Sequence, residues 1–412
     1  PNAFPIIADC PSWRNRPGVA PPPTMLPDPR KSAMDLKSSR SRVASKSIQI
    51  RDGEMAALRG DHASRGDRDT VGEIKRRSRS SAFLVASGRF VTAMLSLAGM
   101  IIIARDLGPQ EFAPFAFAVT VLAIVELLTE QGFDAALAQK QGDVDHFLDT
   151  VWTVNMTRGF GLTISCMVLG VVMKGVGCSD GRAEMLMAIG AVPGIKGLES
   201  LAKVTLTRVL AFRGVVANEV CASILGFVSS VAAYTTTSIG VWSLAVGAIV
   251  SNVASTLGSY VVLPRRPVVR FCREDYRELR RFGLWVAIAK YASAAITKGP
   301  GLVVAVLLPA SALSIYQLAD KLATTATMEV SRIINRVALP MYSRSLEHGG
   351  LGFLYSQYEG SVSKVGAASY AVFMVMLISS ESVVLLLAGQ KWLAVSGHLP
   401  WISLWGASRA SR

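Results

Sequence analysis

The sequence carries little charge for its length. Only 17% of its 412 residues are charged, whereas about 25% is usual in a soluble domain. Hydrophobic residues make up 51% of the chain, and the mean hydropathy is +0.39. A helix needs about 20 apolar residues to cross a bilayer, and many runs here reach that length. The shortage of charge therefore argues against a soluble domain and predicts an all-α, polytopic membrane protein.

The sequence also lacks the groups of a catalytic or metal centre. Its four histidines are scattered without ligand spacing, so we expect no metal and no cofactor. The Gly-rich stretch KGPG, residues 298–301, lacks the strand and helix that a phosphate-binding loop requires. All predicted outer loops are short, which disfavours a membrane glycosyltransferase or polymerase. We therefore predict that the chain is not an enzyme.

Residues 1–75 differ from the rest of the chain. This segment is rich in Pro, Ser, Arg and Asp and has no sustained periodicity, so we expect a disordered basic tail. It has neither the long apolar core nor the cleavage site of a signal peptide. The net charge of +14 is typical of cytoplasmic loops and anionic-lipid contact in a membrane protein, and we expect no nucleic-acid partner.

Ten apolar segments follow the tail. Seven arginines fall between residues 265 and 281, in a loop on the same predicted side as the tail. Because Lys and Arg favour cytoplasmic loops, we expect a multi-pass membrane protein with a cytoplasmic N-terminus. The predicted helices are 82–104, 111–130, 151–173, 183–203, 215–236, 239–263, 284–306, 311–336, 361–387 and 393–406.

The sequence contains an internal repeat with an offset of 201 residues. Phe83–Ala118 aligns without gaps on Leu284–Ala319, and Arg89 falls on Lys290. Six helices separate the two starting points, so the repeats are parallel. This pattern predicts two six-helix lobes around a central cavity, as in an alternating-access transporter.

The repeat also sets the expected domain boundaries. We place the N-terminal lobe at 80–263 and an incomplete C-terminal lobe of about four helices at 284–412. Between them, residues 264–283 carry charges on one face, which predicts a cytoplasmic amphipathic linker in contact with anionic lipid.

Embedded cations are the first candidates for a binding site. Arg89 and Lys290 occupy matching depths on the first helix of each lobe, where they would favour an anionic headgroup such as a diphosphate. Arg158 and Lys298 are further candidates, and Lys298 adjoins Pro300, where we expect a kink. The alternative for all four cations is that they snorkel to the membrane interface.

Embedded acids form a second group of candidates. Asp320 and Glu329 either form structural ion pairs or carry a proton for coupling, with Glu126 and Glu219 as weaker candidates for that task. Lys196 is predicted to pair with Glu199.

Four stretches resemble the bacterial polysaccharide flippases, in the polysaccharide transporter branch of the multidrug/oligosaccharidyl-lipid/polysaccharide exporter superfamily. The resemblance covers about residues 80–395. The stretches are ARDLGPQEFAPFAFA, LTEQGFDAALAQKQGDVDHFLDTVWTVNMTRG, VALPMYSR and AGQKWLAV.

The resemblance implies transport of an undecaprenyl-diphosphate-linked oligosaccharide across the bacterial inner membrane for surface polysaccharide biosynthesis, including lipopolysaccharide or exopolysaccharide. It implies that basic residues on the first helices of the lobes, here Arg89 and Lys290, hold the diphosphate. Polysaccharide polymerases are the partners that it suggests. A multidrug cation exporter of the same superfamily remains the alternative, and it would need a net acidic cavity.

Overall fold

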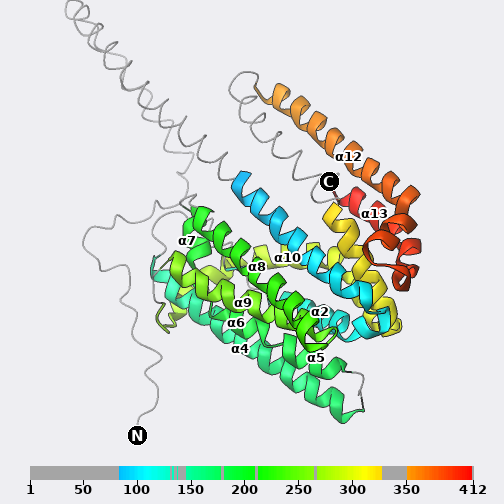
Figure 1. Cartoon of the computed structure of the whole chain (residues 1–412). Coiled ribbons are helices and arrows are strands. Elements are labelled where there is room, and N and C mark those ends of the chain that lie inside the picture. Colours follow the sequence, from blue (N-terminus) through cyan, green and yellow to red (C-terminus); the bar gives the residue numbers. More distant parts are fainter. Residues whose placement is uncertain are drawn as a thin grey trace, which may run out of the picture. The chain divides into compact units, whose positions relative to one another are not determined.

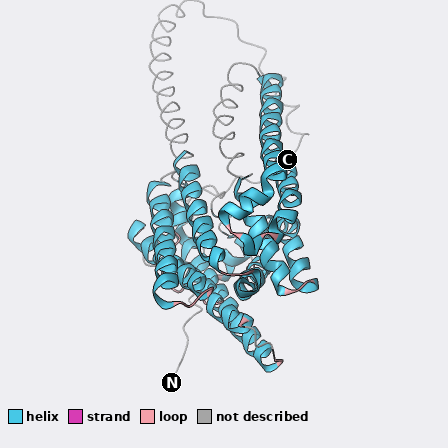
Figure 2. Ribbon diagram, turned by 45° about the vertical axis from the view of Figure 1, so that its right-hand side comes forward, coloured by secondary structure: helices cyan, strands magenta, loops and turns pink. Residues whose placement is uncertain are grey.

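All regular secondary structure in the described part of the chain is helical (Figures 1 and 2). The structure, a computed structural model, contains no strand in the residues that it describes. This confirms the predicted all-α class. The predicted tail and Glu329 lie outside the described residues, which are 83–129, 132–133, 137, 145–177, 181–208, 212–263, 267–326 and 350–410.

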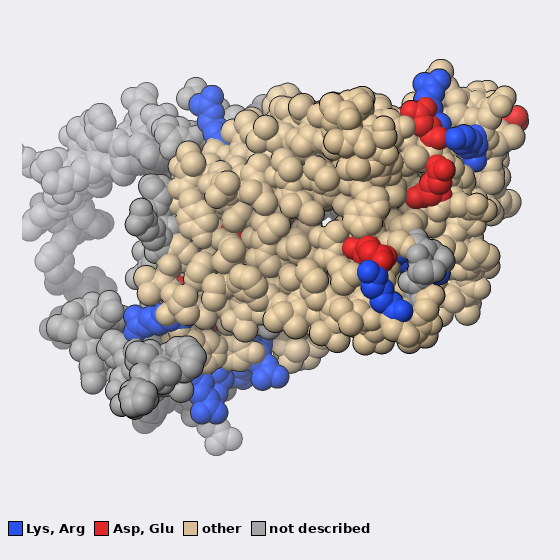
Figure 3. All heavy atoms as spheres, turned by 60° about the horizontal axis from the view of Figure 1, so that its bottom comes forward, with Lys and Arg blue, Asp and Glu red and all other residues tan. Residues whose placement is uncertain are grey.

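Six of the described helices are long and apolar enough to cross a membrane. With no water in the bilayer core, a spanning backbone must satisfy its own polar groups, and a helix does so within one segment. Figure 3 shows a broad uncharged surface, with Lys, Arg, Asp and Glu gathered mostly towards its two edges. The six are Phe83–Asp106, Pro109–Leu128, Phe147–Gly175, Phe212–Thr237, Trp242–Val262 and Gly366–Leu387.

The order of the helices follows the predicted apolar segments. The described part of the chain starts with the helix Phe83–Asp106 and includes an unlabelled helix over 310–326 after α10. The labelled helices are α2 (Pro109–Leu128), α4 (Asp145–Gly175), α5 (Arg182–Ile189), α6 (Val192–Gly197), α7 (Ala202–Arg208), α8 (Phe212–Thr237), α9 (Trp242–Val262), α10 (Arg273–Leu307), α12 (Gly350–Leu387) and α13 (Ala394–Ala410).

Two segments differ from their predicted form. The predicted helix 183–203 is divided into α5, α6 and α7, because Gly190 and the stretch around Leu198 interrupt it. The segment predicted as a separate linker, 264–283, instead contributes its second half to α10, which begins at Arg273 and runs through Pro300 without a break.

One end of the bundle is closed by tight turns, which we call the short-turn end (107–108, 238–241 and 388–393). Trp392, from the turn between α12 and α13, is fully buried. Its indole N–H donates to the carbonyls of Ala104 at 2.6 Å and Leu107 at 2.9 Å, and its ring packs edge-on against Phe112. Because these carbonyls end a helix, the turn also caps that helix.

The opposite end, which we call the basic-loop end, joins α4 to the segment 268–275. The backbone N–H of Arg270 donates to the hydroxyl of Thr153 at 3.0 Å. The Thr150 hydroxyl accepts from the N–H of Cys272 and donates to the Asp275 carboxylate, both at 3.3 Å. These bonds fix the start of α10 to the predicted N-terminal lobe.

Gly132 lies against α10. Its φ is +69°, and a Cβ there would come 2.7 Å from the carbonyl oxygen of Gly283. Only glycine fits both the left-handed backbone and this spacing. The residue therefore sets the distance between the end of α2 and α10.

We expect Trp392→Phe to lower the thermal stability of the purified protein. The change keeps an aromatic ring but leaves the carbonyls of Ala104 and Leu107 without this donor, at a cost of about 1–3 kcal/mol. Unfolding temperature in detergent measures the effect, with Trp401→Phe as the matched control because Trp401 is 72% exposed. Equal changes in both variants would contradict the proposed role of the indole.

Candidate functional site

The two repeat copies meet each other near the centre of the molecule. The side-chain amide of Gln317 donates to the carbonyl of Ala116 at 2.6 Å, and these residues are 201 apart, the offset of the repeat. Equivalent positions touch when they lie close to the axis that relates two copies. The contact therefore marks the axis between the copies.

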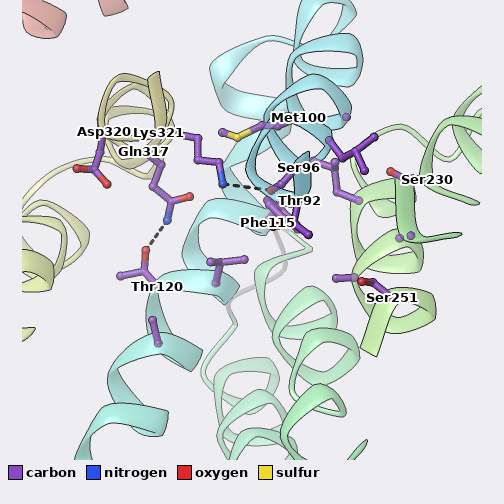
Figure 4. A pocket seen from close by; sticks show the side chains of 18 of the residues that line it. Thr92, Ser96, Met100, Phe115, Thr120, Ser230, Ser251, Gln317, Asp320 and Lys321 are labelled. Carbon is purple, nitrogen blue, oxygen red and sulfur yellow. Dashed lines mark hydrogen bonds between the residues drawn. The ribbon is translucent and has the colours of Figure 1, made fainter. Parts of the chain in front are cut away.

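A cavity of about 470 Å³ lies at this axis, and we call it the hydroxyl-lined cavity. Figure 4 shows Gln317 and Lys321 on one side and Ser230 and Ser251 on the other. Three pairs of repeat-equivalent residues line it: Ser96 and Thr297, Met100 and Gly301, and Phe115 and Tyr316. The central cavity predicted from the repeat is thus present.

A second cavity of about 870 Å³ adjoins it, and we call it the basic cavity. Ala123, Thr297 and Lys298 line both cavities. The charged residues on its walls are Arg158, Lys196, Lys203, Lys298, Glu126 and Glu199. Four cations against two acids give these walls a net positive charge.

The divided fourth helix forms one wall of the basic cavity. At the break after α6, side chains of α9 satisfy the backbone. Thr256 donates to the Ile195 carbonyl at 3.1 Å, and Tyr260 donates to the Leu198 carbonyl at 2.6 Å. Interrupted helices occur at membrane depth where they line a cavity. The break places Lys196 and Lys203 on the wall.

Arg158 extends from α4 across to α2. Its Nε donates to the Thr129 hydroxyl at 3.1 Å, and Nη2 donates to the Glu126 carbonyl at 3.3 Å. These bonds hold the guanidinium at the cavity wall, where the sequence predicted a cation.

Two lysines of this wall pair with carboxylates of other helices. Lys196 Nζ lies 3.3 Å from Glu126 Oε1, and Lys203 Nζ lies 2.5 Å from Glu219 Oε1. The prediction that Lys196 pairs with Glu199 is wrong, because the break after α6 turns Lys196 towards α2. Sequence reasoning missed both lysines as site residues, although Pro193 and Gly197 signalled an interrupted helix.

Of the remaining residues predicted for the binding site, some line the hydroxyl-lined cavity and others lie on exposed surfaces. Asp320 and Lys298 line the hydroxyl-lined cavity, and Lys321 there donates to the Ser96 hydroxyl at 3.1 Å. Arg89 and Lys290 have exposed side chains and line neither of these two cavities. Their role in binding stays a prediction.

Helices α8 and α9 cross at very short distance beside the hydroxyl-lined cavity. A Cβ on Gly247 would come 2.7 Å from the Gly226 carbonyl and 2.6 Å from the Ser230 Cβ. A Cβ on Gly226 would come 2.6 Å from the Ser251 Cβ. Small residues permit such close approach of membrane helices.

Comparison with known proteins identifies the family. Residues 102–397 match the family described as "Polysaccharide biosynthesis protein". The chain belongs to this family. The "Lipopolysaccharide biosynthesis protein WzxC" of Escherichia coli (strain K12) is 24% identical over 349 residues, covering 82% of this chain and 68% of that protein. The resemblance inferred from the sequence is thereby confirmed at the level of the family.

The fold of this family member is also found in a solved transporter. A structure described as "Inward-facing conformation of a multidrug resistance MATE family transporter of the MOP superfamily" superposes with a TM-score of 0.55. The match has 16% identity and covers 75% of each chain. At this identity the likeness concerns the fold alone.

We expect Gly247→Ala to destabilise the protein by about 1–3 kcal/mol, because the added methyl group has no space between α8 and α9. Unfolding temperature in detergent again measures the effect. Gly161→Ala is the control, since a Cβ at Gly161 meets nothing within 4 Å. An unchanged stability of Gly247→Ala would contradict the tight crossing.

Proposed function

We propose that the protein translocates a lipid-linked oligosaccharide across the bacterial inner membrane and is not an enzyme. The observation that supports this most directly is the basic cavity. Its four cations, Arg158, Lys196, Lys203 and Lys298, suit the diphosphate that joins glycan and undecaprenyl lipid. Arg and Lys are the side chains that bind phosphate groups most strongly.

The charge of the basic cavity supports one of the two transporter classes considered, which are a flippase for a lipid-linked glycan and an exporter of cationic drugs. A cationic drug would be repelled by walls with a net positive charge, and we therefore favour the lipid-linked glycan over a cationic drug as substrate. The carboxylates of Glu126 and Glu219 pair with Lys196 and Lys203. Arg158 and Lys298 then carry the positive charge of the walls against Glu199. A diphosphate would take over the two paired lysines as it enters.

Translocation follows from the arrangement of the two halves. A glycan diphosphate cannot cross hydrocarbon unaided because its charges and hydroxyls would lose their hydration. The cavity replaces that hydration while the lipid tail stays in the bilayer. Rocking of the two repeats about their shared axis then exposes the headgroup to the other side. We place the N-terminus in the cytoplasm and expect polysaccharide polymerases as partners.

Transport in proteoliposomes tests this proposal. We expect the purified full chain to flip a labelled undecaprenyl-diphosphate oligosaccharide and not a cationic dye. Dye transport without lipid transport would instead favour a drug exporter and contradict the proposal.

The cations of the basic cavity have a matched control elsewhere in the chain. We expect Lys196→Gln and Lys298→Gln each to weaken binding of the diphosphate lipid about tenfold or more, since each removes a charge-assisted contact. Lys174→Gln should leave binding unchanged, because Lys174 pairs with Glu184 at 2.8 Å and lines neither cavity. Equal effects of all three changes would contradict the assignment of the site.

Arg89 and Lys290 require a separate test. Because both side chains are exposed outside the two cavities, we propose that they attract the headgroup before it enters. The double variant Arg89→Ala/Lys290→Ala should slow transport most at low salt. A loss of equilibrium binding as large as that of Lys298→Gln would instead place them in the diphosphate site.

A further inference from the structure

Two serines of the hydroxyl-lined cavity have hydroxyls with no hydrogen bond in the described part of the chain. They are Ser230 on α8 and Ser251 on α9. Ser230 is only 4% exposed, and its Oγ is buried. A buried hydroxyl without a partner costs free energy, so its presence calls for an explanation.

Other serines of α8 satisfy their hydroxyls by bonding to carbonyls of their own helix. The hydroxyl of Ser223 donates to the Glu219 carbonyl at 2.8 Å, and that of Ser229 donates to the Gly226 carbonyl at 3.0 Å. Helical serines commonly satisfy themselves in this way. Ser230 and Ser251 do not, although both line the cavity. The Ser230 Oγ is buried at the crossing of α8 and α9, so a ligand in the cavity reaches it only when that crossing adjusts.

The opposite wall of this cavity offers a different set of groups. Gln317 and Lys321 come from the helix 310–326. In Figure 4 the Gln317 amide donates to the Thr120 hydroxyl and the Lys321 ammonium to the Ser96 hydroxyl, and both of these hydroxyls also line the cavity. Phe115 and Tyr316 add aromatic surface. Scattered hydroxyl, amide and ammonium groups on a partly apolar wall match a sugar ring, which presents hydroxyls at its edge and C–H groups on its faces.

The size and position of the cavity fit one part of the proposed substrate. Its volume of about 470 Å³ falls within the range of small-molecule sites. Thr297 and Lys298 line both cavities, so a group bound here can be joined directly to a diphosphate in the basic cavity.

We propose that the hydroxyl-lined cavity binds the sugar that is attached directly to the diphosphate, and that Ser230 and Ser251 contribute to the recognition of that sugar. This inference rests on the proposed function, because it assumes a diphosphate in the basic cavity. The buried Ser230 hydroxyl becomes satisfied when the sugar enters and the crossing of α8 and α9 adjusts around it. The protein thereby selects for the first sugar as well as for the diphosphate.

Binding of two probes to the purified full chain tests this inference. The probes are undecaprenyl diphosphate and undecaprenyl diphosphate carrying one N-acetylglucosamine. We expect the sugar-bearing lipid to bind more tightly to the unchanged protein. In Ser230→Ala/Ser251→Ala this preference should fall roughly three- to tenfold, as expected for lost hydrogen bonds, while binding of the sugar-free lipid stays the same.

Ser229→Ala is the matched control. It makes the same chemical change one residue away, at a hydroxyl that is satisfied within its helix and does not line the cavity. It should keep the preference for the sugar. The double variant removes hydroxyls that have no partner, so we expect its unfolding temperature to be no lower than that of the unchanged protein.

The possible results separate the two proposals. Equal binding of both lipids to the unchanged protein, or an undiminished preference in the double variant, would overturn the sugar site and leave the diphosphate site intact. Binding of neither lipid would overturn the proposed function and the sugar site with it. An equal loss of binding for both lipids in the double variant would show a structural role for the serines and also overturn the inference.

Discussion

The contact between Gln317 and Ala116 marks the place where the two repeat copies meet, beside the hydroxyl-lined cavity. It joins equivalent positions of the two repeat copies, so the copies must face each other around this point. The residues that flank it in each copy consequently line one shared space. Hydrophobic packing holds the halves together at the short-turn end, where residues of both halves form one buried cluster around Phe112 and Trp392.

The electrostatics of the basic cavity follow from the cost of charge in an apolar surrounding. An embedded cation needs a partner or a water-filled space. Here Lys196 and Lys203 have both, because they pair with carboxylates and face a cavity. A transported substrate must also leave, and carboxylates that compete for the same cations limit how tightly a diphosphate is held. The pairs thus suit transport better than permanent binding.

The sequence predicted the helices and the repeat because both depend on local, periodic features. Apolar length fixed the spans, and the offset of 201 residues predicted the central cavity that Ser96, Thr297, Phe115 and Tyr316 line. The break after α6 was harder to predict, since it depends on Thr256 and Tyr260 of a distant helix. Lys196 was therefore assigned the wrong partner, and depth along a helix could not reveal which cavity, if any, Arg89 and Lys290 face.

A structure of the protein with a bound lipid-linked oligosaccharide would test the central claim most directly. Density for the diphosphate would reveal which cations hold it without relying on the effects of substitutions. The account predicts that density between Arg158, Lys196 and Lys298, with the first sugar beside Ser251. A diphosphate held by Arg89 and Lys290, outside both cavities, would contradict it.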